Sequence, residues 1–394
     1  MTSEWRTIRA ADFIDFNPRL SLKKGDIVTK VAMDKLKPFT KKIPETEKAE
    51  FNGGAKFCNG DTVMARITPC LENGKTAYVD MLDDGEIGFG STEFIVMRAK
   101  TGISDPQFVY YTAINPVFRN VAIKSMVGSS GRQRVQQSVL EELELSVPDL
   151  DEQRRIGDFL ARIDERIALN DRINDNLEQQ AQSYFQELFV DNADPEWTTG
   201  TISDLGAVVG GSTPSKAKPE YYTESGIAWI TPKDLSINKS KFASHGENDI
   251  TELGLKNSSA VIMPEGTVLF SSRAPIGYIA IATGEVTTNQ GFKSVVPKPE
   301  IGTPFVYFFL KNTLPVIEGM ASGSTFKEVS GSTMKKVPAV IPDAETLAKF
   351  SSFCAPIFAQ QRILEEQNQS LAILRDNLLP KLMSGEIDVS DVQL

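Results

Sequence analysis

The chain is 394 residues long, with 41% hydrophobic residues, 24% charged residues and a formal net charge of -10. This length accommodates two or three domains, and the composition is that of a globular protein. No apolar run reaches the roughly 18 residues of a membrane span, and the first residues lack the basic start and apolar stretch of a signal peptide. The 3 cysteines are spaced too irregularly for a disulfide framework. We therefore expect a cytoplasmic protein with no membrane partner.

The acidic charge is concentrated in two segments. Residues 148–193 carry 5 basic and 11 acidic side chains, and residues 342–394 carry 4 and 8. Residues 1–147, with 20 basic and 19 acidic side chains, and residues 195–341, with 13 of each, are close to neutral. The net charge therefore does not exclude a polyanionic ligand, because the near-neutral parts can present local basic faces.

The chain repeats itself at a spacing of 194 residues. Identical residues recur at this spacing in the pairs Met126 and Met320, Val135 and Val329, Pro148 and Pro342, and Leu177 and Leu371. Two copies are too few for a solenoid, so the pattern indicates a tandem duplication of one globular domain and one helix. The predicted segments are a first domain (1–147), a first helix (148–193), a second domain (194–341), and a second helix with a tail (342–394).

Each helical segment carries a heptad repeat, which is typical of a coiled-coil seam. Asn170, Asn174, Gln361 and Asn368 form a polar layer in the middle of the seam, where such a layer fixes register and orientation. The alternative is that each helix packs only on its own domain. The seam residues that we predict are Ile156, Leu160, Ile163, Ile167, Asn170, Asn174, Leu177 and Leu188 in the first helix, and Ile357, Leu364, Asn368, Leu371 and Leu378 in the second.

The helix ends and the linkers predict the direction of the two helices. Asp149 followed by Glu152 has the spacing of a capping box, so the first helix should begin near residue 150. Pro380 should end or kink the second helix near Leu379. Because the linker DNADPEW is short, the second domain must follow the far end of the first helix, and the second helix must run back. The pair should therefore be antiparallel.

The globular halves mix short β-rich runs, such as DTVMARI and GTVLFSS, with helical patches such as PFVYFFLKN. We therefore predict an α+β fold, with two tandem globular domains separated by two long antiparallel coiled-coil helices and related by a pseudo-twofold axis. The 37 residues from Glu152 to Leu188 would span roughly 55 Å at 1.5 Å per residue.

The motifs of common catalytic sites are missing from the sequence. NGKT at residues 73–76 resembles the end of a phosphate-binding loop, but Pro69 stands where that motif needs a glycine. His245 is the single histidine and has no cysteine or acidic neighbour at ligand spacing. We therefore expect no catalytic residue, no metal site and no cofactor in this chain.

Polar, basic loops rich in small residues recur in both halves, among them GGSTPSKAKPEYY and VGSSGRQRVQQ. Arg, Asn and Gln pair bidentately with guanine and adenine edges, while Ser, Thr and Lys suit phosphates. The alternative for any one of these residues is an ordinary solvated turn. The candidate DNA-binding residues are Arg66, Lys75, Arg132, Gln133 and Arg134 in the first half, and Ser212, Thr213, Lys216, Lys218, Ser271, Ser272, Arg273, Asn289, Gln290, Lys293 and Lys327 in the second.

Several of these stretches resemble the specificity subunit of type I restriction-modification enzymes. The resemblance rests on AWITPKDL, GTVLFSSRAPIGYIAIATGEVTTNQGFKSV and ASGSTFKEVSGSTMKKVPAVIP in the second domain and on ARITPCLENGKTA in the first. VPDLDEQRRIGDFLARID and LLPKLMSGEI resemble the central and distal conserved helices of that family. One departure is the start of the second helix, DAETLAKFSSF, which lacks the Glu-Gln pair that stands at Glu152 and Gln153.

This resemblance implies two target recognition domains that each read one half of a gapped site in double-stranded DNA. It implies two methyltransferase subunits that bind AdoMet, and restriction subunits that use ATP and Mg²⁺, as partners that carry out the chemistry. The acidic helical surface is better suited to protein than to phosphate, so we expect the methyltransferase subunits to dock there. Two alternatives are a coiled-coil scaffold that binds protein through its domains, and a solitary DNA methyltransferase or nuclease.

Overall fold

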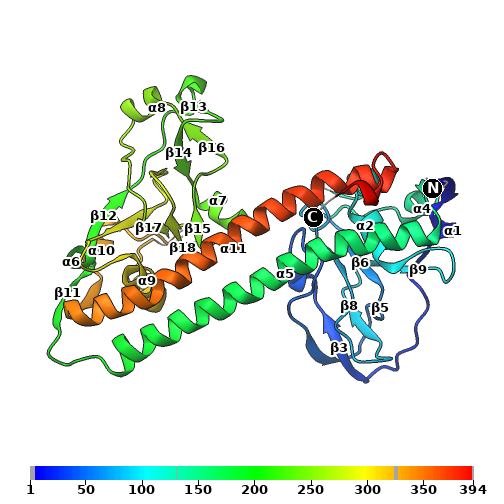
Figure 1. Ribbon diagram of the computed structural model, residues 1–394, viewed down its shortest axis with the longest axis horizontal. Coiled ribbons are helices and arrows are strands. Elements are labelled where there is room, and N and C mark those ends of the chain that lie inside the picture. Colours follow the sequence, from blue (N-terminus) through cyan, green and yellow to red (C-terminus); the bar gives the residue numbers. More distant parts are fainter. Residues whose placement is uncertain (1–4, 130, 324–326, 393–394) are drawn as a thin grey trace. The chain divides into compact units, whose positions relative to one another are not determined.

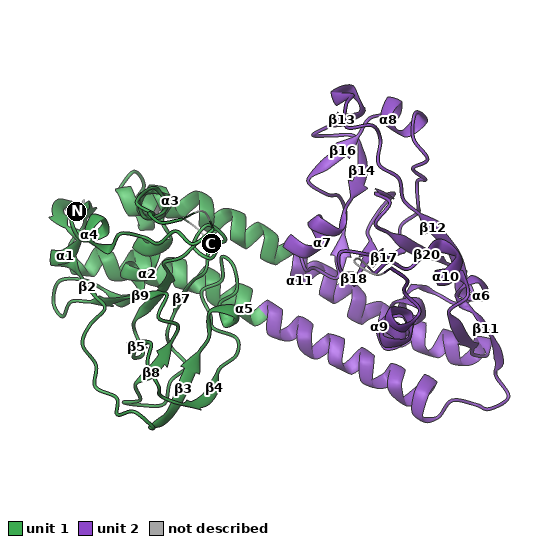
Figure 2. Ribbon diagram, turned by 180° about the vertical axis from the view of Figure 1, so that it is seen from behind, with its two compact units in different colours: residues 1–169, 367–394 green, residues 170–366 purple. Residues whose placement is uncertain are grey.

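The computed structural model describes residues 5–129, 131–323 and 327–392, and the chain divides into two compact units (Figure 2). Unit 1 comprises residues 1–169 and 367–394, and unit 2 comprises residues 170–366. Each unit contains one α+β domain together with one stretch of each long helix (Figure 1). The sequence predicts four consecutive segments instead: domain, helix, domain and helix. The two units cut across the helices, so this division stays a prediction.

Two four-stranded sheets and one two-stranded ribbon form the domain of unit 1. The first sheet has the order β2-β9-β6-β7 and is antiparallel throughout. The second has the order β4-β3-β8-β5, and β3 runs parallel to β8. The ribbon pairs β1 (Arg6–Arg9) with β10 (Glu144–Val147), which brings the two ends of the domain together. The other strands are β2 (Ile14–Phe16), β3 (Ile27–Val31), β4 (Glu47–Glu50), β5 (Ala55–Phe57), β6 (Thr62–Ala65), β7 (Thr76–Tyr78), β8 (Gly88–Gly90) and β9 (Phe94–Ala99).

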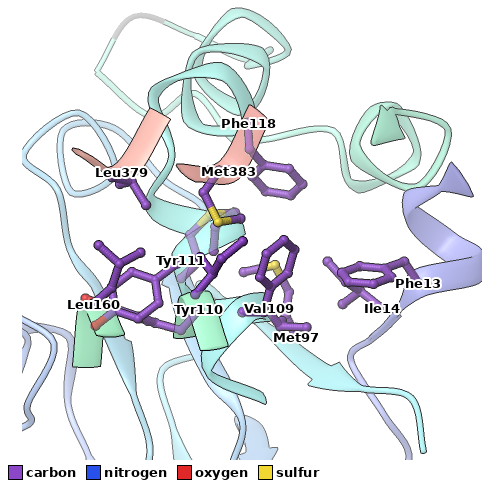
Figure 3. Close-up of a cluster of buried hydrophobic side chains, with 14 of the residues drawn as sticks. Phe13, Ile14, Met97, Val109, Tyr110, Tyr111, Phe118, Leu160, Leu379 and Met383 are labelled. Atoms are coloured by element: carbon purple, nitrogen blue, oxygen red, sulfur yellow. The ribbon is translucent and has the colours of Figure 1, made fainter. Parts of the chain in front are cut away.

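The helices of this domain cover its core. Asp105 caps α2 (Pro106–Ile114) by accepting hydrogen bonds from the backbone N–H groups of Gln107 and Phe108. Figure 3 shows side chains of α2 packed among residues of the sheet and of both long helices. The shorter helices of unit 1 are α1 (Ala10–Phe13), η1 (Met33–Lys35), α3 (Pro116–Lys124), α4 (Gln137–Glu141) and η4 (Val389–Asp391).

The domain of unit 2 is built in the same way. A five-stranded sheet has the order β12-β20-β17-β18-β15, a four-stranded sheet has the order β13-β16-β14-β19, and β11 pairs with β21. The strands are β11 (Thr198–Thr201), β12 (Gly206–Gly210), β13 (Tyr222–Thr223), β14 (Ile227–Ile230), β15 (Phe242–Ala243), β16 (Asn248–Ile250), β17 (Val268–Ser272), β18 (Ile276–Ala282), β19 (Thr287–Thr288), β20 (Lys293–Pro297) and β21 (Pro338–Ile341). The helices are α6 (Ile202–Leu205), η3 (Pro219–Tyr221), α7 (Pro232–Ile237), α8 (Glu252–Lys256), α9 (Thr303–Gly319) and α10 (Gly331–Lys335).

The two domains share the central strands of their sheets, as the internal repeat predicts, although β15 extends one sheet of the second domain by a fifth strand. The run β2-β9-β6-β7 matches β12-β20-β17-β18 in order and direction. The parallel pair β3 and β8 matches the parallel pair β14 and β19. One difference lies in the helices. The first domain has two short helices, α2 and α3, separated at Asn115, whereas the second has one continuous helix, α9, that contains Pro315. The duplication is therefore visible in the sheet topology as well as in the sequence.

The long helices are α5 (Leu150–Gln186), followed by a π-helical turn, η2 (Glu187–Asp191), and α11 (Ala344–Ser384). In unit 1 the early α5 residue Leu160 shares a core with the late α11 residue Leu379. In unit 2 the late α5 residue Phe185 shares a core with the early α11 residue Phe350. Early residues of one helix meet late residues of the other in both units, so the helices are antiparallel, as predicted. The pseudo-twofold axis stays a prediction.

Every predicted seam residue is buried or half-buried. The polar layer makes contacts across the two helices within each unit: Gln361 donates a hydrogen bond to the Asn174 carbonyl (3.2 Å), and Asn368 donates one to the Ile167 carbonyl (3.4 Å). The buried seam residues are Ile156, Leu160, Ile163, Asn170, Ile357 and Leu364, and the half-buried ones are Ile167, Asn174, Leu177, Leu188, Asn368, Leu371 and Leu378.

Both long helices begin just after a Pro-Asp pair. The Asp149 carboxylate accepts a hydrogen bond from the Glu152 N–H (2.9 Å), and the helix begins at Leu150, as predicted. The second helix was predicted to end or kink near Leu379. It does not end there, because α11 continues through Pro380 to Ser384, and the kink stays a prediction. The residues after the proline are held by the core of unit 1, in which Leu382 is fully buried. This burial offsets the backbone hydrogen bond that the proline cannot make.

A buried lysine attaches the domain of unit 2 to both helices. Lys241 is only 7% exposed, and its ammonium group lies 2.8 Å from the Glu178 carboxylate of α5 and 2.9 Å from the Gln361 amide oxygen of α11. Burial lowers the pKa of Lys241 to about 8, although Glu178 acts in the opposite direction. Burial alone would raise the pKa of Glu178, but Lys241 and Lys311 lower it below its usual value.

The domain of unit 1 uses the equivalent lysine in a longer hydrogen-bond chain. Lys41 is 5% exposed and donates to the Tyr111 hydroxyl (3.2 Å), which donates to the Asp164 carboxylate of α5 (2.6 Å). Asp164 in turn pairs with Arg375 of α11 (2.6 Å). Burial lowers the pKa of Lys41 to about 8. Both domains are thus fixed to the helices by charged groups rather than by apolar contacts alone.

Among the described residues, no helix combines the length and apolar character needed to cross a membrane. No group of three or more His, Cys, Asp or Glu side chains within the described ranges could hold a metal ion.

Candidate nucleic-acid interface

Three of the predicted loops of the second domain converge on one surface hollow of about 630 Å³. Thr213 and Lys216 come from the loop after β12, Arg273 from the loop after β17, and Asn289 and Gln290 from the loop after β19. The AWITPKDL stretch supplies half of the remaining lining residues, which are Trp229, Thr231, Pro232, Lys233, Asp234, Ser236, Glu247, Asn248, Ala274 and Gly291.

Strand geometry brings these loops together. Because β14 and β19 are parallel, their carboxyl ends meet at the same sheet edge. The loop after β12 is joined to this edge by a hydrogen bond from the Ser212 N–H to the Thr288 carbonyl (2.8 Å). Gly211 is required there, because a Cβ atom at this position would lie 2.0 Å from the Asn289 carbonyl oxygen. The backbone therefore places side chains from distant parts of the sequence around one hollow.

Three cationic side chains line the hollow, and they differ in whether they form an ion pair. The Lys216 side chain is exposed. Lys233 is paired with Glu247 (2.6 Å), and Arg273 is paired with Glu328 (3.3 Å). Exposed pairs of this kind are weak and exchange readily with other anions. The cations are therefore available to a polyanionic ligand such as a phosphate backbone.

Other candidate residues of the second domain lie beside the hollow. Lys218 is exposed, with its ammonium group 5.2 Å from the centre of the Tyr221 ring. The Ser212 carbonyl accepts a hydrogen bond from the Trp229 indole (3.0 Å), so this residue supports the wall of the hollow. Lys327 lines a neighbouring hollow of about 620 Å³ that also includes Arg273.

Lys293, Ser271 and Ser272 face inward. Burial lowers the pKa of Lys293, whose ammonium group donates to the Gln290 carbonyl (3.2 Å). The Ser271 hydroxyl donates to the Pro275 carbonyl (2.8 Å), and the Ser272 hydroxyl donates to the Gly291 carbonyl (3.1 Å). Both serines are fully buried, so in this structure they hold the loops in place and do not present hydroxyl groups to a ligand.

The first domain has a hollow of about 600 Å³ at the corresponding place. It lies where β2 and β6 end, which match β12 and β17 of the second domain. Arg66 is the one sequence-predicted residue in its lining, and its guanidinium donates to the Val135 carbonyl (3.2 Å). The other lining residues are Asn17, Pro18, Arg19, Leu20, Gly54, Ala55, Lys56, Thr92 and Phe94.

The remaining candidates of the first domain are not gathered in this hollow. Lys75 is half-buried and donates to the Met33 carbonyl (2.9 Å), so its charge supports a loop. Arg132 is exposed. The backbone carbonyl of Gln133, which is half-buried, accepts a hydrogen bond from the Thr68 N–H (3.0 Å). Arg134 is exposed and pairs with Glu93 (2.9 Å).

A loop ion pair of opposite polarity borders each hollow. In the first domain Val135 donates its N–H to the Arg66 carbonyl (2.8 Å), and the preceding residue, Arg134, pairs with Glu93. In the second domain Val329 donates to the Ser272 carbonyl (3.0 Å), and its preceding residue, Glu328, pairs with Arg273. The backbone contact is the same in the two domains, while the loop residue before it is a cation in the first and an anion in the second. Its partner comes from a different position in each domain, because the backbone contact that Glu93 makes with Arg66 is made by Gly291 with Ser272.

Sequence reasoning missed several lining residues. Trp229, Thr231 and Lys233 belong to the AWITPKDL stretch, whose family resemblance was a usable signal. Asn17 and Arg19 come from the loop after β2, and Lys56 comes from strand β5. No motif in the sequence marks either segment.

The fold and the two hollows define a class: a duplicated α+β protein whose domains present equivalent polar, cationic surfaces and are joined by a pair of antiparallel helices. The family model described as "Type I restriction modification DNA specificity domain" matches residues 3–179 and 195–374. The chain therefore belongs to this family, which confirms the resemblance found in the sequence.

Similar proteins agree with this family. The chain is 40% identical to the type I restriction enzyme MjaIX specificity subunit of Methanocaldococcus jannaschii, over 43% of this chain and 40% of that protein. It is 24% identical to the HindI specificity subunit of Haemophilus influenzae, over 83% of this chain and 86% of that protein. The crystal structure of a type I restriction-modification S subunit from M. genitalium has a TM-score of 0.56 and 18% identity, and the match covers 96% of each chain. This last likeness shows a shared fold.

Proposed function

We propose that this chain is the non-catalytic DNA specificity subunit of a type I restriction-modification complex, and that each domain reads one half of a gapped site in double-stranded DNA. The observation that carries the proposal is the pair of hollows at equivalent strand ends of the two domains. One hollow carries Lys216 and Arg273, and the other carries Arg19 and Arg66. Two copies of one binding surface suit a ligand that has two separate half-sites.

The side chains divide into two roles in this proposal. Exposed cations such as Arg19 and Lys216 contact phosphate oxygens, which gives affinity without sequence preference. Arg273, Asn289 and Gln290 reach base edges, which gives specificity. A coiled-coil scaffold that binds only protein would not need cationic hollows in both domains, and family membership favours the DNA reader over that alternative.

The helices are proposed to set the gap between the half-sites. At 1.5 Å per residue, the 37 residues of α5 correspond to roughly 55 Å. One turn of B-DNA is about 34 to 36 Å, so a spacer of this length separates the two contacts by more than a helical turn. Shortening each helix by one heptad should change the length of the gap in the recognised site.

The exposed acidic faces of the helices are proposed to bind two methyltransferase subunits, one for each half of the chain. Asp158 and Glu165 are exposed on α5, away from the seam. In this assignment AdoMet binds to the methyltransferase subunits, and ATP and Mg²⁺ serve restriction subunits, while the present chain supplies sequence recognition in the cytoplasm.

Exchange of the first domain tests the proposed function. Residues 1–147 are replaced by the corresponding domain of another specificity subunit, and methylated bases are mapped in a host that expresses the complex. One half of the recognised site should change, while the other half and the gap should stay the same. An unchanged motif would contradict the assignment of this domain to DNA recognition.

Charge reversal on α5 tests the docking surface. Asp158→Lys with Glu165→Lys should weaken co-purification of the methyltransferase subunits and leave the sequence preference intact. Asp83→Lys with Glu224→Lys makes the same charge change on exposed residues outside the long helices and serves as the control. Intact assembly with an altered preference would contradict the proposed docking site.

A further inference from the structure

We propose that the half-site read by the second domain contains a guanine, and that Asn289 is a residue that selects it. This inference rests on the proposed function, because it assigns a base to the hollow that is proposed to face DNA. It follows from the direction of the hydrogen-bonding groups in that hollow.

The amide of Asn289 has a fixed orientation. Its side-chain oxygen accepts a hydrogen bond from the Gly291 N–H (2.8 Å). A backbone N–H can only donate, so the oxygen must face Gly291 and the NH₂ group must point the other way. Asn289 lines the hollow, and its NH₂ group donates to no residue in the part of the chain that the structure describes. The group is therefore an unused donor at the hollow.

Gln290, one residue later, also turns its side-chain oxygen toward a group of the protein. The Thr213 hydroxyl donates to the side-chain oxygen of Gln290, which leaves the NH₂ group of this exposed residue as a donor. Arg273 adds the donors of its guanidinium from the opposite loop. Three side chains from two loops thus offer N–H groups to the same ligand.

The acceptors of the hollow are largely occupied. The Asp234 carboxylate accepts from the Thr231 N–H (2.7 Å), from the Thr231 hydroxyl (2.7 Å) and from the Glu247 N–H (2.9 Å). Glu247 is paired with Lys233 (2.6 Å). Asn248 is an exposed lining residue whose amide oxygen stays open, so the hollow is rich in donors without being devoid of acceptors.

The excess of hydrogen-bond donors over open acceptors in the hollow distinguishes among the four bases. In the major groove guanine presents two acceptors, N7 and O6, on one edge. Adenine pairs its N7 acceptor with an amino donor, and cytosine presents an amino donor. An amino group facing the NH₂ of Asn289 would leave two donors opposed, which costs a buried hydrogen bond. The donor-rich hollow therefore fits guanine, which offers two acceptors on this edge, better than thymine, which offers the single O4 acceptor beside a methyl group, and better than adenine or cytosine.

The test is a change of base preference in Asn289→Asp. This substitution keeps the oxygen that binds the Gly291 N–H and turns the free donor into an acceptor. The full-length chain, in complex with its methyltransferase subunits, is allowed to bind a duplex DNA pool with randomised half-sites, and bound duplexes are sequenced. Asn257→Asp, on an exposed residue outside the hollow, makes the same charge change in the same domain and is the control.

We expect the wild type and Asn257→Asp to enrich a two-part site in which one half contains a guanine. Asn289→Asp should lower the preference for that guanine by roughly tenfold in favour of a base that carries an amino donor, and leave the other half unchanged. A two-part site with no guanine in the affected half, or an unchanged site in Asn289→Asp, would overturn this inference and leave the proposed function standing. A wild-type complex that enriches no two-part site would overturn the proposed function itself.

Discussion

The two domains share a framework and differ in the charges that border it. Both have the same sheet order and a hollow at the same strand ends. In the first domain the loop residue Arg134 pairs with Glu93 of the framework, whereas in the second the loop residue Glu328 pairs with Arg273. The comparison teaches that the backbone contact fixes the position of the loop, while the charge of the residue before this contact can change when a partner of opposite charge is supplied from another position.

The contact that fixes each domain to the long helices also differs between the two copies. Lys241 contacts Glu178 of α5 directly, whereas Lys41 reaches Asp164 through the Tyr111 hydroxyl. In both domains the lysine is buried among aromatic rings. A buried charge of this kind is stabilising only while its partner is present, so each attachment can be broken separately.

The largest effect is expected from Glu178→Gln. It leaves Lys241 and Lys311 without their carboxylate partner, and loss of one member of a buried pair costs about 3 kcal/mol or more of the free energy of unfolding. Calorimetry should show that the transition of unit 2 moves to lower temperature while that of unit 1 is retained. Asp175→Asn, an exposed change on the same helix, is the control. Equal destabilisation of both transitions would contradict the separate attachment of the domains.

A pH dependence of stability is the second prediction. The pKa of Lys241 is about 8 in the folded chain and 10.5 in its unperturbed state, so between these values the unfolded chain binds more protons than the folded chain. The contribution of Lys241 to the free energy of unfolding should therefore rise with pH, by about 1 kcal/mol per pH unit. Below pH 8 the cost of burying the charge is fully present.

The measurement compares the wild type with Lys241→Met by denaturant unfolding between pH 8 and 9.5. The difference between the two should grow with pH, because the variant lacks the titrating group. Lys256→Met, on an exposed residue of the same domain, should run parallel to the wild type. A constant difference between wild type and Lys241→Met would show that the lysine stays charged when folded.

The third prediction uses the opposite polarity of the loop ion pairs. Glu328→Gln frees Arg273 for DNA and removes a negative charge from the interface, so it should tighten DNA binding several-fold, with a steeper loss of affinity as salt rises. Arg134→Gln leaves Glu93 uncompensated and should weaken binding several-fold. Fluorescence anisotropy at several salt concentrations would measure both. Effects of the same sign in the two variants would contradict the reversed arrangement.

The smallest effect concerns stability at the same loops. Arg134→Glu places two carboxylates together and should lower the free energy of unfolding by about 1 kcal/mol or less, because exposed ion pairs contribute little. The double variant with Glu93→Arg restores an ion pair of the polarity found in the second domain and should recover most of this loss. A double variant less stable than both single variants would show that the side chains, and not their charges alone, fix the loop.

Regular patterns in the sequence predicted the helices better than the hollows. The heptads predicted the buried seam, and the start at Leu150 followed from the capping pattern. The composition of a loop, in contrast, does not show which way its side chains point. Ser271 and Ser272 were chosen for their hydroxyl groups, but a register shift between Phe270 and Ser272 places both inside the sheet.

Long-range contacts were beyond sequence reasoning. A lysine is seldom fully buried, and nothing local marks Lys41 or Lys241 as exceptions. Their environment consists of rings and carboxylates from segments more than 30 residues away, such as Tyr111 and Glu178. The first hollow was missed for the same reason, because residues from separate loops meet only in the folded domain.

The reversed loop ion pairs also bear on how such chains can be recombined. Both members of each pair lie inside one domain, Glu93 with Arg134 and Arg273 with Glu328. A crossover inside α5 or α11 transfers a complete pair and a complete hollow. A crossover after β9 and before the loop that carries Arg134 would join the strands of one copy to the loop of the other. It would bring the carboxylates of Glu93 and Glu328 together. The unit of exchange that this architecture tolerates is a whole domain, so new specificities are expected to arise by reassortment of intact halves.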